Sequence, residues 1–221
     1  MKKMHKWTIQ RTFTPLYPLL TNFLSAKLYS TILEVRGMAM DQSILPASSN
    51  MKEFENFLKS PFKVGILLET HISQLKNISK MAKSNGKEMI YHVDMIQGIR
   101  NDDYATEFIC QEFKPYGLIS TKSSVILKAK QKGVVAIQRI FLIDSHALGK
   151  SYRLIEKTKP DYIEVLPGAM PWMIKEVLEQ VNTPILAGGL IRTEEDIKNA
   201  LAAGASAITT SKTSLWDIFH E

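Results

Sequence analysis

Short apolar runs alternate with amphipathic segments of about ten residues along the chain from Ser43 onward. The apolar runs predict strands at 44–47, 64–69, 88–94, 117–120, 134–141, 162–166, 185–187 and 207–210. The segments between them predict helices at 51–59, 73–84, 103–113, 123–131, 145–158, 171–180 and 193–203. Such alternation is typical of an α/β protein with a parallel sheet. Eight units in about 180 residues favour a compact (βα)8 barrel of the TIM type. An open doubly wound sheet is the alternative, but no GxGxxG motif follows the first strand.

The last two units carry the pattern of a phosphate site. Gly188 and Gly189 end one predicted strand and allow a ligand to approach the backbone, and Thr193 then provides an N-cap for the next helix. The following strand ends in two hydroxyl residues, with a short helix expected near Ser214. Loops after the seventh and eighth strands of such barrels commonly hold phosphate, although the glycines could equally serve only tight turns. The candidate phosphate-binding residues are Gly168, Gly188, Gly189, Thr210 and Ser211.

Polar residues near the carboxyl ends of other predicted strands form a second candidate set, because TIM-type barrels place their ligands there. The candidates for binding a polyol are Glu69, His92, Asp94, Gln138, Arg139 and Glu164. Gln138 and Arg139 alternate along one strand, so only one can point into the barrel. A buried carboxylate paired with arginine, or a structural histidine, is the simpler interpretation. The carboxylates follow no metal-binding motif, and HExxH, P-loop and GxSxG motifs are absent, so we expect no bound metal.

The charge of the chain is unevenly distributed. Residues 1–37 contain six Lys/Arg and one acidic residue, whereas residues 38–221 contain 22 Lys/Arg and 21 acidic residues. Most of the net charge of +6 therefore comes from residues 1–37. This segment has no sustained period, and we expect it to be a leader outside a single barrel domain spanning 38–221. A signal peptide is conceivable, although prolines interrupt its apolar part; another interpretation is upstream sequence preceding a start at Met38 or Met40.

The single cysteine and the length of the apolar runs indicate the cellular compartment of the protein. Cys110 lies in a helical pattern with aromatic residues, which predicts a packed thiol and excludes an intramolecular disulfide. No apolar run approaches the roughly 20 residues of a membrane-spanning helix. We therefore expect a cytoplasmic protein with no membrane partner.

Several strings at predicted strand ends resemble the glycerol uptake operon antiterminator proteins of low-GC Gram-positive bacteria. The most specific are IQG, IST, AIQR and EVLPG, and the resemblance runs from Met40 to about Trp216. It implies a barrel-fold regulator rather than an enzyme, with glycerol 3-phosphate as its effector and no cofactor. It also implies action on the leader mRNA of glycerol-utilisation operons to prevent termination. The resemblance has no counterpart for residues 1–37, and a homo-oligomer is compatible with it.

An RNA-binding surface is harder to predict, because no RNA-recognition motif or KH signature is present. Residues 122–159 contain nine Lys/Arg and two acidic residues, which makes this region the candidate RNA-binding surface. A solvated helical face can have the same composition. The candidates are Lys122, Lys128, Lys130, Lys132, Lys150, Arg153 and Lys157. The alternative function is a barrel enzyme, an isomerase, epimerase or aldolase acting on a phosphorylated metabolite, with Glu69 or Asp94 as base and His92 as acid.

Overall fold

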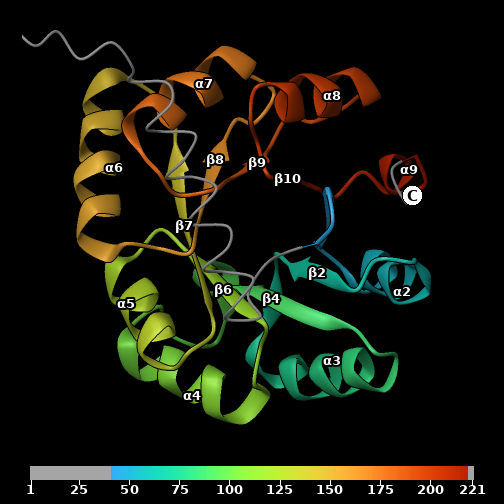
Figure 1. Cartoon of the computed structure of the whole chain (residues 1–221). Helices are drawn as coiled ribbons and strands as arrows, with labels where there is room; N and C mark the ends of the chain where they lie inside the picture. The colour runs from blue at the N-terminus through green and yellow to red at the C-terminus, as the bar shows by residue number, and fades with distance from the viewer. Residues whose placement is uncertain (1–40, 219–221) are drawn as a thin grey trace, which may run out of the picture.

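Eight parallel strands close into a barrel in the computed structural model, which describes residues 41–218 (Figure 1). Their order around the barrel is β1-β10-β9-β8-β7-β6-β4-β2, so strands that follow one another along the chain lie side by side. The strands are β1 (Ile44–Ser48), β2 (Val64–Leu67), β4 (Glu88–His92), β6 (Gly117–Ser120), β7 (Val135–Phe141), β8 (Tyr162–Leu166), β9 (Ile185–Gly188) and β10 (Ala207–Thr210). The predicted TIM-type barrel is therefore confirmed.

Helices cover the outside of the barrel and return the chain from one strand to the next. They are α2 (Met51–Lys59), α3 (Ile72–Ser84), α4 (Asp103–Phe113), α5 (Ser123–Gln131), α6 (Ser145–Thr158), α7 (Pro171–Gln180), α8 (Glu194–Ala202) and the short α9 (Thr213–Trp216). Asn50, Asp102, Asp144 and Thr193 each cap a helix, because their side chains accept hydrogen bonds from the first-turn amides. No helix within residues 41–218 is long and apolar enough to cross a membrane.

Two apolar clusters result from the alternation of side chains along the strands. On β7, Val135 and Ile137 belong to the cluster inside the barrel, whereas Ala136 and Ile140 belong to the larger cluster between strands and helices. Cys110 is buried in the larger cluster, and burial is the main cause that raises the pKa of its thiol to about 11. The predicted packed thiol is confirmed.

The structure shortens two predicted strands by two residues each, moves the end of β1, the start of β7 and the end of β9 by one residue, and adds elements that the pattern did not predict. β2 ends at Leu67 rather than 69, and β4 ends at His92 rather than 94, where the 3₁₀ helix η1 (Val93–Met95) follows. A separate two-stranded sheet joins β3 (Thr70–His71) to β5 (Ile96–Gln97). Glu69 and Asp94 therefore lie beyond the barrel strands, with different surroundings. The expected leader, 1–37, lies outside the described residues.

Candidate functional site

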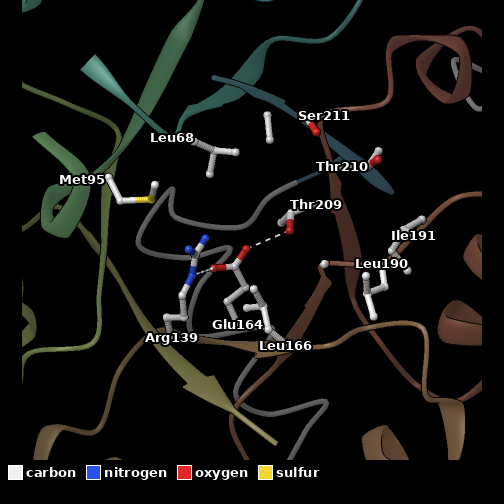
Figure 2. A pocket seen from close by; sticks show the side chains of 12 residues that line it. Leu68, Met95, Arg139, Glu164, Leu166, Leu190, Ile191, Thr209, Thr210 and Ser211 are labelled. Carbon is white, nitrogen blue, oxygen red and sulfur yellow. Dashed lines mark hydrogen bonds and ion pairs between the residues drawn. The ribbon is translucent and has the colours of Figure 1, made fainter. Parts of the chain in front are cut away.

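A buried polar network occupies the carboxyl end of the barrel interior. The Nε of Arg139 donates to Oε2 of Glu164 at 2.6 Å, and the hydroxyl of Thr209 donates to Oε1 of the same carboxylate at 2.8 Å (Figure 2). The three residues come from β7, β8 and β10, and Glu164 is 1% exposed. An unpaired carboxylate at this depth would be costly, so the two donors hold its charge in place.

Glycine at position 188 lets this network form. A Cβ there would lie 2.2 Å from the Thr209 hydroxyl oxygen, which is too close for a real side chain, and 3.0 Å from Oε1 of Glu164, which is tighter than most Cβ contacts. Gly188 ends β9, which lies between β8 and β10 in the barrel. Gly188 was predicted to admit a phosphate; what the structure shows is that the absence of a side chain here leaves room for the hydrogen bond between Thr209 and Glu164.

Gly168 packs against the same part of β9. A Cβ on it would lie 2.5 Å from the amide nitrogen of Gly188, so the two backbones approach each other closely. The amide of Gly168 donates to the carbonyl oxygens of Gly188 and Gly189, at 2.5 and 3.1 Å. This amide is therefore already engaged, and the predicted role of Gly168 as a phosphate donor gains no support from its hydrogen bonds.

A cavity of about 290 Å³ opens above the network. Arg139, Glu164 and Thr209 line its polar part, and Gly189, Thr210 and Ser211 line it where the loops after β9 and β10 begin. The apolar lining consists of Ala47, Leu68, Met95, Leu166, Leu190 and Ile191. A small concave site with few polar groups among apolar walls suits a small metabolite.

His92 lies beside this network and has no polar partner. Its side chain is 3% exposed, and neither ring nitrogen has a hydrogen-bond partner within residues 41–218. Burial, followed by the positive charge of Arg139, lowers the pKa of His92 to about 4. The imidazole is thus neutral near pH 7, with one nitrogen able to donate a hydrogen bond and the other able to accept one.

Asp94 forms hydrogen bonds that hold the backbone after β6. Its carboxylate accepts hydrogen bonds from the Ser120 hydroxyl at 2.5 Å, the Thr121 amide at 2.7 Å and the Thr121 hydroxyl at 2.8 Å. Burial favours a higher pKa for Asp94, but these hydrogen bonds and the nearby His92 together lower it. The residue thereby fixes the loop between β6 and α5.

Two further predicted polyol ligands lie away from the cavity. Gln138 faces the opposite side of β7 from Arg139, and its side-chain amide donates to the Ser120 carbonyl at 3.0 Å. The prediction that only one of this pair points inward is therefore confirmed, with Arg139 inside. Glu69 is exposed and lines a different pocket, together with residues of the β3–β5 sheet.

Thr209 and all the apolar residues that line the cavity, among them Met95 and Leu190, were not predicted as site residues. Thr209 completes the network, and Met95 and Leu190 line the cavity. Leu190 adopts a φ of +59°, which is uncommon for a residue with a side chain. Thr209 could have been found from its position two residues after the inward-facing Ala207, whereas no sequence signal marks Met95 or Leu190.

The predicted basic surface divides into paired and exposed residues. Glu107 pairs with Lys132 and with Lys128, at 3.4 Å from the latter, and Lys130 lies 3.8 Å from Asp161. By contrast, four of the predicted residues are exposed: Lys122, Lys150, Arg153 and Lys157. The last three recur on one face of α6, because positions three and four apart are neighbours on a helix.

Comparison with known proteins gives these features a family context. A glycerol uptake operon antiterminator regulatory protein from Listeria monocytogenes is 45% identical, with a TM-score of 0.78 over 80% of this chain and 96% of that one. An antiterminator-related protein from Thermotoga maritima is 30% identical, with a TM-score of 0.71 over 80% and 98%. The protein YgcP of Escherichia coli K12 is 36% identical over 152 residues, which are 69% of this chain and 80% of YgcP.

The match to the family itself spans most of the barrel. The sequence profile of the glycerol-3-phosphate responsive antiterminators matches residues 44–216, from β1 to α9. Every residue of the polar network and the cavity falls within this range. The chain therefore belongs to the glycerol-3-phosphate responsive antiterminator family, whose members regulate transcription.

Proposed function

We propose that the chain binds glycerol 3-phosphate in the cavity above Arg139 and Glu164, and that binding controls its action on the leader mRNA of glycerol-utilisation operons. The observation that carries this proposal is the arrangement of polar groups in one small cavity. Hydroxyl and backbone groups lie where the β9 and β10 loops begin, and a charged network lies in the barrel interior. A ligand with a phosphate at one end and hydroxyls at the other matches this division.

The phosphate is assigned to the loops after β9 and β10. Gly189, Thr210 and Ser211 line the cavity here, and Gly189 has a φ of +74°, which favours glycine. The indole Nε1 of Trp216 donates to the carbonyl of Thr210 at 3.0 Å, which fixes the end of β10. A backbone held in this way can direct amides at an anion without rearranging when it binds.

The glycerol hydroxyls are assigned to the interior end, near Arg139 and His92. The Nε of Arg139 is used by Glu164, but a guanidinium has four further N–H donors. His92 is not among the residues that line the cavity, but its unpartnered nitrogens offer one donor and one acceptor to a hydroxyl that reaches past Arg139. A hydroxyl group can both donate and accept, so a polyol would satisfy buried groups that phosphate alone would leave unpaired.

The positions of the carboxylates support a ligand-binding role without turnover. Glu164 accepts hydrogen bonds at both oxygens, Asp94 holds a loop, and Glu69 lines a different pocket. Each carboxylate that we considered as a general base is therefore engaged or displaced, and family membership favours a regulator. The proposal places no chemical step in the cavity.

The exposed basic face of α6, formed by Lys150, Arg153 and Lys157, is the proposed RNA contact. Lys and Arg on one helix face can neutralise successive phosphates of a nucleic acid. The lysines of α5 contribute less, because Lys128 and Lys132 pair with Glu107. Since α6 directly follows β7, a ligand that contacts Arg139 would act on the strand next to this helix.

Calorimetric titration with glycerol 3-phosphate and with glycerol, followed by product analysis, tests the ligand assignment. We expect glycerol 3-phosphate to bind at least about tenfold more tightly than glycerol, because charge-assisted hydrogen bonds are the strong ones. The ligand should be recovered unchanged after prolonged incubation. Equal affinity for the two compounds would contradict the phosphate site, and a converted product would assign the cavity to an enzyme.

A further inference from the structure

Two neighbouring helices present large apolar side chains to solvent. Tyr104 and Phe108 on α4 are 81% and 44% exposed, and Leu127 on α5 is 42% exposed. α4 and α5 pack side by side on one flank of the barrel (Figure 1). A single exposed apolar residue is ordinary, but two aromatic residues and a leucine on adjacent helices are typical of a protein–protein interface.

Ion pairs link these two helices beside the apolar residues. Glu107 of α4 pairs with both Lys128 and Lys132, which lie in α5 and at its C-terminal end. Glu107 precedes Phe108 in the chain, and Lys128 follows Leu127. These ion pairs help to fix the relative position of Phe108 and Leu127 before any partner binds, which reduces the entropy lost on association.

The two helices also carry opposite charge. α4 contains Asp103, Glu107 and Glu112 and no basic residue. α5 and the residues flanking it contain four lysines and no acidic residue; Lys128 and Lys132 pair with Glu107 and Lys130 lies near Asp161, which leaves Lys122 at the start of α5 to face Asp103 of a second copy. A surface with an acidic half and a basic half on either side of an apolar centre can pair with its own copy.

The directions of the helices agree with such pairing. Both helices return antiparallel to the barrel strands, so they run in the same direction, and Phe108 and Leu127 each lie at the middle of their helix. A two-fold axis parallel to the helices and between them places α4 of one copy against α5 of the other at the same height. Phe108 then meets Leu127, and Asp103 at the start of α4 meets Lys122 at the start of α5.

We propose that the face formed by α4 and α5 is the interface of a symmetric dimer of this chain. The apolar centre supplies most of the affinity, as aromatic residues near the middle of an interface commonly do. The acidic and basic halves set the orientation and disfavour other arrangements. This inference does not depend on the ligand or on RNA, so its outcome is separate from that of the proposed function.

Sedimentation velocity of the full chain between about 1 and 100 μM tests the proposal, since this range covers the affinities of many specific dimers. The wild type should sediment as a dimer at the upper end. Leu127→Glu and Phe108→Glu should each raise the dissociation constant about thirtyfold or more, because each places a charge in the apolar centre. Trp172→Glu is the matched control, because Trp172 is 61% exposed at the start of α7 and lies outside this face.

A charge exchange tests the orientation. Asp103→Lys and Lys122→Glu should each weaken the dimer severalfold, because the two-fold axis makes each substitution act at two contacts. The double variant restores opposite charges across the interface and should recover most of the affinity.

The proposal is overturned by a wild type that stays monomeric, which would assign the face to a different partner. It is equally overturned by a dimer that tolerates Leu127→Glu, or by one that Trp172→Glu dissociates. Circular dichroism melting of every variant checks that each one is folded.

Discussion

At the scale of single residues, Gly188 shows how a backbone position can control a side-chain network. A methyl group at this position would lie 2.2 Å from the Thr209 hydroxyl oxygen, and would break the hydrogen bond that Thr209 donates to Glu164. We expect Gly188→Ala to lower the free energy of unfolding by about 1–3 kcal/mol, through crowding and a buried carboxylate that loses a donor. Urea unfolding measures this change.

Gly149 offers the matched control for that substitution. It lies within α6, and a Cβ there would meet only the Arg153 side chain, at 3.9 Å. Gly149→Ala should therefore raise the free energy of unfolding by about 0.5–1 kcal/mol, as expected for alanine replacing glycine inside a helix. If both substitutions changed the free energy of unfolding in the same direction, crowding beside Gly188 would not explain the effect of Gly188→Ala.

His92 predicts a specific dependence of stability on pH. Its pKa is lowered from 6.5 to about 4 in the folded chain, so the unfolded state binds more protons between these values. Stability should therefore rise with pH across this window, by about 3 kcal/mol in total if His92 acts alone. Urea unfolding at pH 4.5 and 6.5 should show a clear difference for the wild type and a smaller one for His92→Gln. An unchanged difference in the variant would assign the effect to other groups.

The charged residues of the site could be predicted from the sequence, but which of Gln138 and Arg139 points into the barrel could not. β7 is buried on both faces, so Ala136 and Ile140 are as apolar as Val135 and Ile137. The pattern therefore contained no signal for whether Gln138 or Arg139 points inward. That choice depends on the register of the closed barrel, which is a property of all the strands together.

At the scale of secondary-structure elements, the number and order of the barrel strands could be predicted but two of their ends could not. Apolar residues continue past the last barrel hydrogen bonds of β2 and β4, so the predicted strands are longer than the observed ones. The two-residue strands β3 and β5 are too short to show any period. Glu69 and Asp94 lie in these transitions, which explains why their surroundings differ from the prediction.

The basic face of α6 carries the prediction for RNA binding. Replacing Lys150, Arg153 and Lys157 together by glutamine should weaken binding to the leader mRNA and reduce the slope of log affinity against log salt by about 2. The paired lysines Lys128 and Lys132, replaced in the same way, are the control and should have a smaller effect. Mobility-shift titrations at two salt concentrations measure both. A larger effect of the control pair would move the RNA surface to α5.

At the scale of the whole molecule, the predicted domain boundary near Met38 leads to a test by truncation. The family match starts at Ile44, and β1 is the first barrel strand within residues 41–218. We therefore expect a chain that begins at Met38 to fold, to bind glycerol 3-phosphate and to melt within a few degrees of the full chain. Calorimetry and thermal unfolding of both chains provide the comparison. Loss of folding or of binding would show that residues 1–37 belong to the domain.

The proposed function connects a cavity inside the barrel to a surface outside it. The measurement that tests this connection most directly is the affinity for leader mRNA with and without saturating glycerol 3-phosphate. For the wild type we predict a change of about 5- to 150-fold, the usual range of coupling between two sites. Gly189→Val should lose this response, because a β-branched residue is strained at a φ of +74° and its Cβ would crowd the side chain of Leu166, which lines the cavity, at 3.3 Å. Equal RNA affinity of the wild type with and without glycerol 3-phosphate would contradict the account.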